Sequence, residues 1–452
     1  MKKYLVLILS VGYLTVGCKG QHRVTQTEKK QTPRTDLSDS ALLDMVQKQT
    51  FQYFWDGAEP SSGLAKERFH VDDPGYDKTI VTSGGAGFGV MSILVGINRG
   101  FITRVAGRIR MEKIIHFLET ADRFHGAWPH WWNGETGKVK PFSENDNGGD
   151  LVETSYMIQG LLCARQYFKD GNVEEKELAQ RIDKLWKQVE FDWYRNGKNV
   201  LFWHWSPDKG WKMNFQVHGY NECLIMYILA ASSPTHAVPA EVYNEGWAEN
   251  GLIRSSHEYY GYKLQLNRQG DAVMGGPLFW SQYSYLGLDP RGLKDTYADY
   301  WLENTSQSMI NYNWCVNNPK KYKGYGPDNW GLTASYSIEG YAGHAPGNDN
   351  DLSVITPSAA LSSFPYTPTQ SMAAMRHWYT NMKDKLWGPY GFYDAFSETA
   401  NWYPQQYLAI DQGPIVVMME NYRSGLLWKL FMSCPEIQTG LKKLGFESPY
   451  LK

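Results

Sequence analysis

The chain has 452 residues, a formal net charge of −2 and only 20% charged residues. Its length allows one large domain or several smaller ones. The near-neutral charge and the lack of a long basic run argue against a nucleic-acid partner.

The N-terminus resembles an export signal. A basic start is followed by an apolar segment, residues 4–16, which is too short to span a bilayer comfortably. The segment ends at Val16-Gly17-Cys18, where a small residue precedes a cysteine as in the lipobox of bacterial lipoproteins. We therefore expect a signal peptide over residues 1–17, acylation of Cys18, and an exported lipoprotein anchored to a periplasmic or cell-surface membrane. An ordinary signal peptide or an N-terminal anchor helix is the alternative.

A polar segment over residues 18–38 is expected to link this anchor to one domain over residues 39–452. Helical periodicity dominates that domain. The expected helices cover residues 38–54, 85–100, 103–123, 150–168, 174–194, 221–231, 240–249, 295–316, 371–385 and 413–430. Strand-like alternation is sparse, and short hairpins are expected only near residues 200–204 and 262–268.

Helices of two kinds alternate along the domain. Segments 85–100 and 150–168 are apolar nearly all round, whereas segments 103–123 and 174–194 are more amphipathic. Two concentric rings explain this pattern, because inner helices touch apolar neighbours on all sides and outer helices face water. The pattern therefore predicts an all-α (α/α) barrel with a pocket at one end. An α-solenoid is the competing architecture, but the sequence has no fixed repeat period.

The cysteines and histidines give no support to a metal centre or a cofactor. Cys163, Cys223, Cys315 and Cys434 are far apart and lack CxxC spacing, and the 11 His are scattered. Two of these cysteines lie inside apolar helical patterns, so we expect buried free thiols. The chain also lacks a GxSxG elbow, an HExxH motif and a phosphate-binding P-loop.

Aromatic residues make up 15% of the chain, with 18 Trp and 30 Tyr. Many of them fall in short segments, such as residues 128–132, 202–205 and 390–394. Packing between helices must account for most of these rings. Flat rings with polar edges also suit a concave site that stacks sugar rings, so their excess in loops favours a carbohydrate ligand.

Carboxylates at the starts of apolar helices are the candidate catalytic groups. Hydrolysis of a glycosidic bond needs two carboxyl groups, one acting as acid and the other as base or nucleophile. Asp146 and Asp150 flank a Gly-Gly turn and could face one cavity, and Glu222 lies in the first turn of the next apolar helix. Helix capping explains Asp150 and Glu153 equally well. The helix dipole would lower the pKa of Glu222, so a general acid there requires burial or a nearby carboxylate to raise it.

Five further residues are candidates for substrate binding. Asp394, Asp411 and Gln412 lie in turn-like segments beside aromatic residues or glycines, where they could bind sugar hydroxyls. Trp330 offers a ring for stacking, and Arg68 could clamp a ligand. Capping or a surface ion pair is the simpler explanation for any one of the charged residues.

Several short motifs together resemble the bacterial glycoamylase-like domain. They are residues 43–47, 50–55, 62–64, 82–89 (TSGGAGFG), 149–154 (GDLVET), 219–222 (GYNE), 330–335 (WGLTAS) and 410–414 (IDQGP). The resemblance implies an (α/α)6 toroid. It also places the chain near glycoside hydrolase family 144, whose characterised members act on β-1,2-glucans with inversion and include endo-β-1,2-glucanases and enzymes that release sophorose-type units.

The resemblance carries the functional acids onto Asp146, Asp150 and Glu222. An inverting pair stands roughly 6.5–9.5 Å apart, and the two aspartates are too close in sequence to suit that separation. We therefore expect Glu222 to be the acid and one aspartate to be the base, with the other orienting water or sugar. Residues 344–351 match the family least well, and a loop there could alter the preference for chain length.

The sequence thus predicts a glycoside hydrolase that cleaves β-glucan, most specifically β-1,2-glucan or its oligosaccharides. A non-catalytic glycan-binding lipoprotein and a toroidal polysaccharide lyase are the alternatives. The presence of all three acids argues against the first. A lyase acting on uronates needs a basic groove, and the net charge of −2 gives little support to it.

Overall fold

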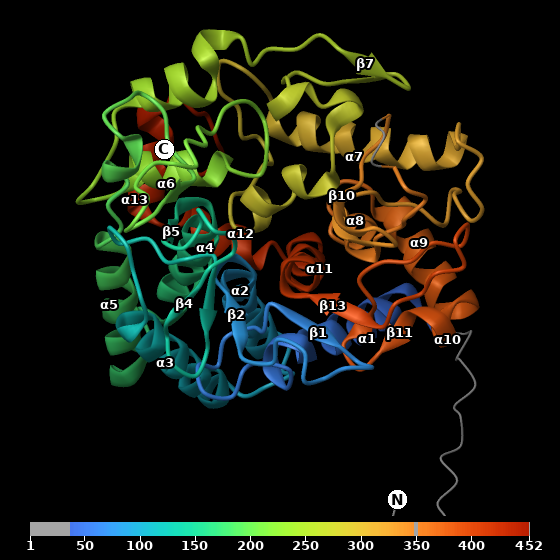
Figure 1. Ribbon diagram of the computed structural model, residues 1–452, viewed down its shortest axis with the longest axis horizontal. Coiled ribbons are helices and arrows are strands. Elements are labelled where there is room, and N and C mark those ends of the chain that lie inside the picture. Colours follow the sequence, from blue (N-terminus) through green and yellow to red (C-terminus); the bar gives the residue numbers. More distant parts are fainter. Residues whose placement is uncertain (1–36, 348–350, 452) are drawn as a thin grey trace, which may run out of the picture.

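The computed structural model describes residues 37–347 and 351–451, and helices dominate them (Figure 1). The expected signal peptide, Cys18 and nearly all of the linker lie outside the described residues. The α-helices are α1 (Asp39–Trp55), α2 (Ser83–Asn98), α3 (Arg104–Thr120), α4 (Leu151–Phe168), α5 (Val173–Lys187), α6 (Leu224–Ser232), α7 (Tyr300–Asn317), α8 (Pro357–Leu361), α9 (Pro368–Asn381), α10 (Lys383–Leu386), α11 (Ala409–Arg423), α12 (Leu426–Met432) and α13 (Pro435–Lys443).

Within the described residues, six segments close into an inner ring. Helix α2 contacts α4 and α11, α4 contacts α6, and α11 contacts α8. Two 3₁₀ turns, η6 (Leu278–Ser281) and η7 (Tyr283–Leu286), fill the place between α6 and α8. Gln282, between these turns, donates a hydrogen bond from Nε2 to the Ala359 carbonyl of α8 at 3.0 Å. Nearly every residue of α2 and α4 is buried, as inner helices require.

The outer ring packs against these segments. Helix α1 lies against α2 and α11, α3 against α2, α5 against α4, α13 against α6, and α9 against α8. Side-chain caps start several of these helices, including Ser38 for α1 and Thr103 for α3. The two rings confirm the predicted (α/α)6 toroid.

The structure departs from the expected helices in four places. The inner turns η6 and η7 and the short helix α8 are not anticipated by the sequence pattern. The expected helix at 240–249 forms over a shorter range and is mostly a π-helix, η2 (Val242–Trp247). The expected helix at 413–430 is divided into α11 and α12 at Gly425, whose φ of +67° is open to glycine at little cost. The last helix, α13, is also unanticipated.

The strands are short and join loops at the ends of the helices. They are β1 (Arg68–His70), β2 (Ile80–Thr82), β3 (Trp131–Asn133), β4 (Val139–Lys140), β5 (Gly149–Asp150), β6 (His204–Trp205), β7 (Glu258–Tyr259), β8 (Tyr262–Lys263), β9 (Ala334–Ser337), β10 (Gly340–Gly343), β11 (Trp387–Gly388), β12 (Gly391–Phe392) and β13 (Gln406–Leu408). The hairpin expected near 262–268 forms slightly earlier, as β7–β8. Near 200–204 the chain forms only isolated antiparallel bridges, Phe202 with Gln216 and Ser206 with Gly210, and β6 pairs with β5.

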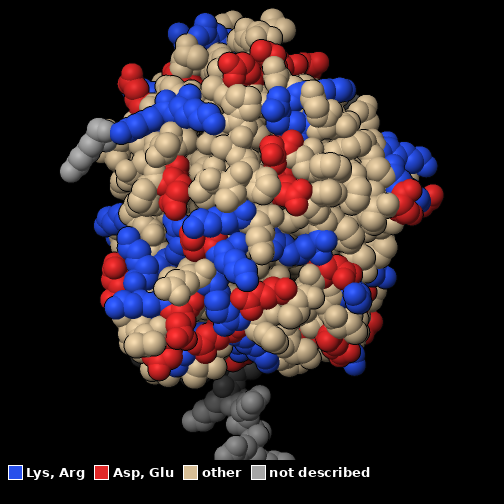
Figure 2. All heavy atoms as spheres, turned by 90° about the vertical axis from the view of Figure 1, so that its left-hand side faces the viewer, with Lys and Arg blue, Asp and Glu red and all other residues tan. Residues whose placement is uncertain are grey.

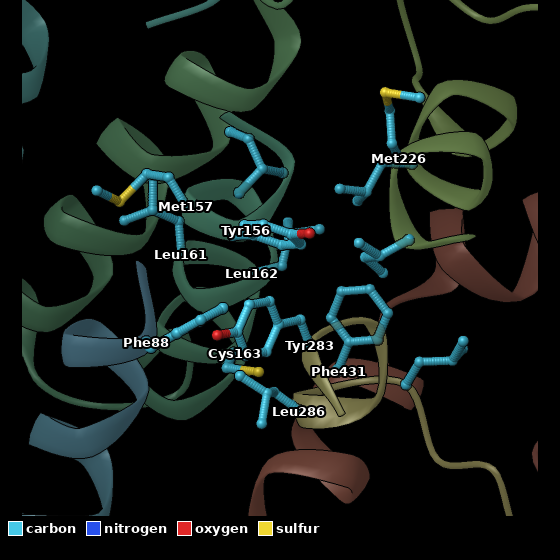
Figure 3. Close-up of a cluster of buried hydrophobic side chains, with 14 of the residues drawn as sticks. Phe88, Tyr156, Met157, Leu161, Leu162, Cys163, Met226, Tyr283, Leu286 and Phe431 are labelled. Carbon is cyan, nitrogen blue, oxygen red and sulfur yellow. The ribbon is translucent and has the colours of Figure 1, made fainter. Parts of the chain in front are cut away.

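The main core fills the space between the inner helices. Figure 3 shows Phe88 of α2, Tyr156 and Cys163 of α4 and Tyr283 of η7 meeting there. The four cysteines of the described residues are free and buried, in agreement with the expectation of buried thiols. No helix in the described part of the chain is long and apolar enough to cross a membrane.

Candidate active site

A cavity of about 430 Å³ lies where the N-terminal ends of the inner segments meet. Its walls include Thr82 just before α2, Glu153 in the first turn of α4, Glu222 just before α6, Phe279 of η6 and Ile410 of α11. This is the end at which a toroid of this kind gathers its loops. The volume falls in the range of sites for small organic ligands.

Aromatic side chains form much of the cavity wall, as the composition suggests. They are Trp131, Phe142, Tyr156, Trp203, Phe279, Tyr283, Tyr336 and Tyr341. Phe142 and Tyr341 are 50% and 60% exposed, so they stand at the mouth, whereas Tyr156 and Tyr283 are buried in its floor. Rings on several sides of a wet cavity can stack against the faces of successive sugar units.

Glu222 has the environment that a general acid requires. Its side chain lines the cavity and is only 8% exposed, and its Oε2 has no hydrogen-bond partner among the described residues. Burial raises its pKa to about 7, and the charges of Glu153 and Asp150 add to this effect. Burial therefore outweighs the nearby helix N-terminus, and the carboxyl is substantially protonated at neutral pH.

Two further acids line the cavity, and neither belongs to the predicted site. Glu153 accepts a hydrogen bond from the Gly84 amide at 2.7 Å, and burial raises its pKa to about 7. Glu67 is paired with Arg68, and burial raises its pKa above the ordinary value. The sequence pattern explains Glu153 as a helix-capping residue, and Glu67 lies in no motif that would identify it as a residue of the active site.

Asp150 and Asp146 are not among the residues that line the cavity. Asp150 is fully buried and caps α4, accepting from the Glu153 amide at 2.9 Å. Its Oδ2 accepts from His130 Nδ1 and from Trp203 Nε1, each at 3.0 Å. Asp146 Oδ2 lies 3.3 Å from His204 Nε2. The structure therefore places the two aspartates behind the wall, where Asp150 holds the cavity-lining His130 and Trp203 and Asp146 lies beside His204.

The charges around Asp150 favour its ionised form. Burial opposes ionisation, but the hydrogen bond from His130 and the charge of His204 hold the pKa of Asp150 below its ordinary value. His130, Asp146 and Asp150 bring possible metal ligands within 4.8 Å of one another. Since Asp150 Oδ2 already accepts two N–H donors, we assign this group to hydrogen bonding.

Asp394 and Asp411 form a second buried acid pair. Each is 1% exposed, and one oxygen of each carboxyl, Asp394 Oδ1 and Asp411 Oδ2, receives no hydrogen bond from an N–H or O–H group of the described residues. Asp394 Oδ2 accepts from the Tyr336 amide at 2.9 Å, and Asp411 Oδ1 accepts from Ser358 Oγ at 3.0 Å. Burial raises the pKa of Asp394 to about 6. Burial and the charge of Asp394 raise the pKa of Asp411 well above its ordinary value, so the pair shares a proton.

The other predicted binding residues divide between the cavity and the core. Arg68 lines the cavity, beside Glu67 and the Tyr336 ring. Gln412 is buried next to Asp411 and donates to the Phe392 carbonyl at 3.3 Å. Trp330 is 0% exposed in a second hydrophobic cluster, and its Nε1 donates to the Gln370 carbonyl at 3.2 Å. Neither Gln412 nor Trp330 is among the cavity-lining residues. Trp330 therefore packs in the hydrophobic core and does not contact the cavity.

Removal of the Trp330 ring tests this placement. We expect Trp330→Ala to lower the free energy of unfolding by about 3–5 kcal/mol, because it leaves a large void in the core. The affinity of the folded protein for the glucan that the sequence predicts as its ligand should stay close to that of the wild type. Trp203→Ala is the matched variant, since Trp203 lines the cavity, and it should weaken glucan binding more than stability. Urea unfolding and calorimetric titration measure the two quantities.

Comparison with known proteins identifies the family. The family model Glycoamylase, described as "Putative glucoamylase", matches residues 214–435. An endo-β-1,2-glucanase from Chitinophaga pinensis, solved with sophorotriose and glucose, is 70% identical with a TM-score of 0.91, and the match covers 92% of this chain and 100% of that one. The chain belongs to the glycoamylase-like family. This membership confirms the resemblance to β-1,2-glucan hydrolases of glycoside hydrolase family 144.

Two further matches are to protein from Parabacteroides distasonis, one to a curated sequence and one to a solved structure. An exo β-1,2-glucooligosaccharide sophorohydrolase (non-reducing end) is 44% identical over 459 residues, and the match covers 95% of this chain. The chain spans only 62% of the length of that relative. A crystal structure of a β-1,2-glucanase is also 44% identical, with a TM-score of 0.86, and covers 90% of this chain and 60% of that one. Endo-acting and exo-acting enzymes thus share this fold.

Proposed function

We propose that this protein hydrolyses β-1,2-glucan or its oligosaccharides with Glu222 as the general acid. The observation that carries the proposal is the Glu222 carboxyl, which is buried in the wall of an aromatic cavity with a pKa of about 7 and an unpartnered Oε2 within the described structure. A protonated carboxyl of this kind can donate to the glycosidic oxygen of the leaving group. The 70% identity to an endo-β-1,2-glucanase supports the choice of linkage.

The Asp394–Asp411 pair is the best-placed candidate for the base. An inverting enzyme needs its base on the face of the sugar ring opposite to the acid. Glu222 precedes α6, and Asp411 lies in the first turn of α11, which stands across the inner ring from α6. Glu153 lies on α4, directly beside α6, and is less well placed. Asp411 follows the cavity-lining Ile410, so one bridging water could connect its carboxylate to the attacking water.

The shared proton predicts how pH acts on this base. In Asp394→Asn the neighbouring negative charge is removed, so the pKa of Asp411 falls. The acidic limb of the kcat–pH profile should therefore move to lower pH. The Asn side chain still offers an oxygen to the Tyr336 amide, which preserves that contact. An acidic limb that stays in place or moves upward would contradict the coupling.

A lyase and a non-catalytic glycan receptor are less consistent with this cavity. Glu67, Glu153 and Glu222 line it, and their carboxyls would repel the carboxylate of a uronate. On the outer face shown in Figure 2, acidic and basic side chains are intermixed. A protein that only binds glycan has no need for buried carboxyl groups with raised pKa values in its cavity wall.

Incubation with linear β-1,2-glucan tests the function and separates these alternatives. Hydrolysis yields reducing sugars without ultraviolet absorbance, elimination yields unsaturated products, and a receptor binds without turnover. NMR during the first turnovers should show the α-anomer released from the β-bond, as inversion requires. Chromatography of early products then separates endo from exo action, and laminarin and starch are the control substrates. Initial release of the β-anomer would exclude the proposed roles.

We propose in addition that Cys18 carries a lipid anchor. The support is the Val16-Gly17-Cys18 sequence after an apolar segment, all of which lies outside the described residues. Mass spectrometry of protein from the membrane fraction should find an acylated Cys18 at the mature N-terminus. A mature chain that starts elsewhere and carries no acyl group would rule this anchor out.

A further inference from the structure

The Gly-Gly-Asp turn before α4 has no direct access to the cavity, yet one residue connects it to the substrate space. His130 lines the cavity, and its Nδ1 lies 3.0 Å from Asp150 Oδ2. The other ring nitrogen, Nε2, has no hydrogen-bond partner among the described residues. Neither the proposed acid nor the proposed base requires this histidine, so its place in the wall needs a separate explanation.

Asp150 holds the imidazole ring in one orientation. Its carboxylate is fixed at the start of an inner helix by the Glu153 amide, and its Oδ2 also accepts from Trp203 Nε1 at 3.0 Å. The Phe142 ring covers one side of the imidazole, with ring centroids 4.2 Å apart. With Nδ1 committed to Asp150 and one face covered, the ring presents its remaining edge to the cavity.

The same surroundings keep His130 charged. Burial disfavours the imidazolium, but Glu153, Asp150 and Asp146 outweigh it and raise the pKa of His130 to about 9. Behind them, His204 Nε2 lies 3.3 Å from Asp146 and 3.8 Å from Asp150, so the aspartates are shared between two histidines. Glu67 is the other acid of the wall on which the charge of His130 acts. At neutral pH both ring nitrogens of His130 carry hydrogen.

We propose that His130 is a substrate-binding residue, that its Nε2–H donates a hydrogen bond to an oxygen of the bound glucan, and that Asp150 is its positioning residue. This inference rests on the proposed function of the cavity. The carboxyls of Glu67, Glu153 and Glu222 in the cavity wall can accept hydrogen bonds from the sugar, and cationic His130 adds a fixed donor beside them. A sugar hydroxyl can then accept a hydrogen bond from His130 and donate its own hydrogen to another acceptor.

Two isosteric variants separate the two nitrogens of the ring. In His130→Asn the amide can still donate to Asp150 but no longer reaches the cavity. In His130→Gln the amide nitrogen extends to the position of Nε2 but loses the contact with Asp150. A hydrogen bond from a charged donor is worth roughly 10-fold to 100-fold in affinity. We expect His130→Asn to lose about this factor in the affinity for β-1,2-linked gluco-oligosaccharides and in kcat/KM, and His130→Gln to lose clearly less.

Asp150→Asn tests the positioning role with little change in the fold, because asparagine caps a helix as well as aspartate does. The variant removes one of the three acidic charges that stabilise the imidazolium, while Glu153 and Asp146 keep theirs. Because the NH₂ group of the asparagine cannot accept from His130 and Trp203 as Oδ2 does, the melting temperature should fall moderately. Oligosaccharide affinity per folded molecule should fall as well, and this fall should vary with pH as neutral His130 replaces the imidazolium. Helix capping alone would predict no change in affinity.

Calorimetric titration and steady-state kinetics on the full chain decide the outcome. Equal losses in His130→Asn and His130→Gln, or no loss in His130→Asn, would overturn the proposed hydrogen bond. Unchanged affinity in Asp150→Asn would overturn the positioning role. If the wild-type protein neither binds nor hydrolyses β-1,2-glucan, the proposed function fails instead, which distinguishes that failure from failure of this inference.

Discussion

Glu222→Gln should reduce kcat on β-1,2-glucan by about 10²–10⁴-fold, because an amide cannot donate the acidic proton that the leaving oxygen needs. The fold should survive, because the amide has the shape of the protonated carboxyl and the Glu222 Oε2 that it replaces has no hydrogen-bond partner among the described residues. Turnover and melting temperature are measured on the same preparation. Glu241→Gln, which alters an exposed glutamate before η2, is the matched control and should leave both quantities unchanged.

The pH profile adds a second readout to this variant. Burial raises the pKa of Glu222 to about 7, so the carboxyl carries its proton below that pH and loses it above. Activity of the wild type should therefore decline as the pH rises through about 7, and the residual activity of Glu222→Gln should show no such decline. A variant with near-normal turnover would remove Glu222 from the role of acid.

Asp411→Asn should reduce turnover by a similar factor of about 10²–10⁴, because it removes the carboxylate that accepts the proton of the attacking water. The free energy of unfolding of this variant at neutral pH should equal or exceed that of the wild type. The Asn oxygen can accept from Ser358 as Asp411 does, and its amide can donate to Asp394 in place of the shared proton. Asp384→Asn, at an exposed position of α10, is the control for the same change of charge.

The comparison with Glu153→Gln decides which carboxylate is the base. Glu153 lines the cavity but lies on the helix beside Glu222 rather than across the ring. If Asp411→Asn keeps near-normal turnover and Glu153→Gln loses it, the assignment of the base passes to Glu153. Added azide offers a further check, since it can replace water in a variant that lacks its base and should form the α-glycosyl azide under inversion.

The amino-acid sequence by itself determines the architecture. Local periodicity and the alternation of wholly apolar with amphipathic segments are short-range properties, and they correctly predict most helices and the two-ring toroid. The GYNE motif also leads to Glu222, which the structure places in the cavity wall. These predictions succeed because each depends only on residues that are neighbours in the chain.

Only the tertiary structure decided the rest of the site. The inner turns η6 and η7 are too short to show a period, and they complete the ring solely because α6, α8 and α11 surround them.

Asp150 satisfies the capping pattern and the catalytic pattern equally in sequence, and its burial against His130 and Trp203 is what turns it away from the cavity. Burial is likewise what raises the pKa of Glu153 to about 7. The coupling of Asp394 with Asp411 depends on the distance between two carboxyls that a loop brings together. Burial and charge proximity set proton affinity, and both arise from packing between segments far apart in the chain.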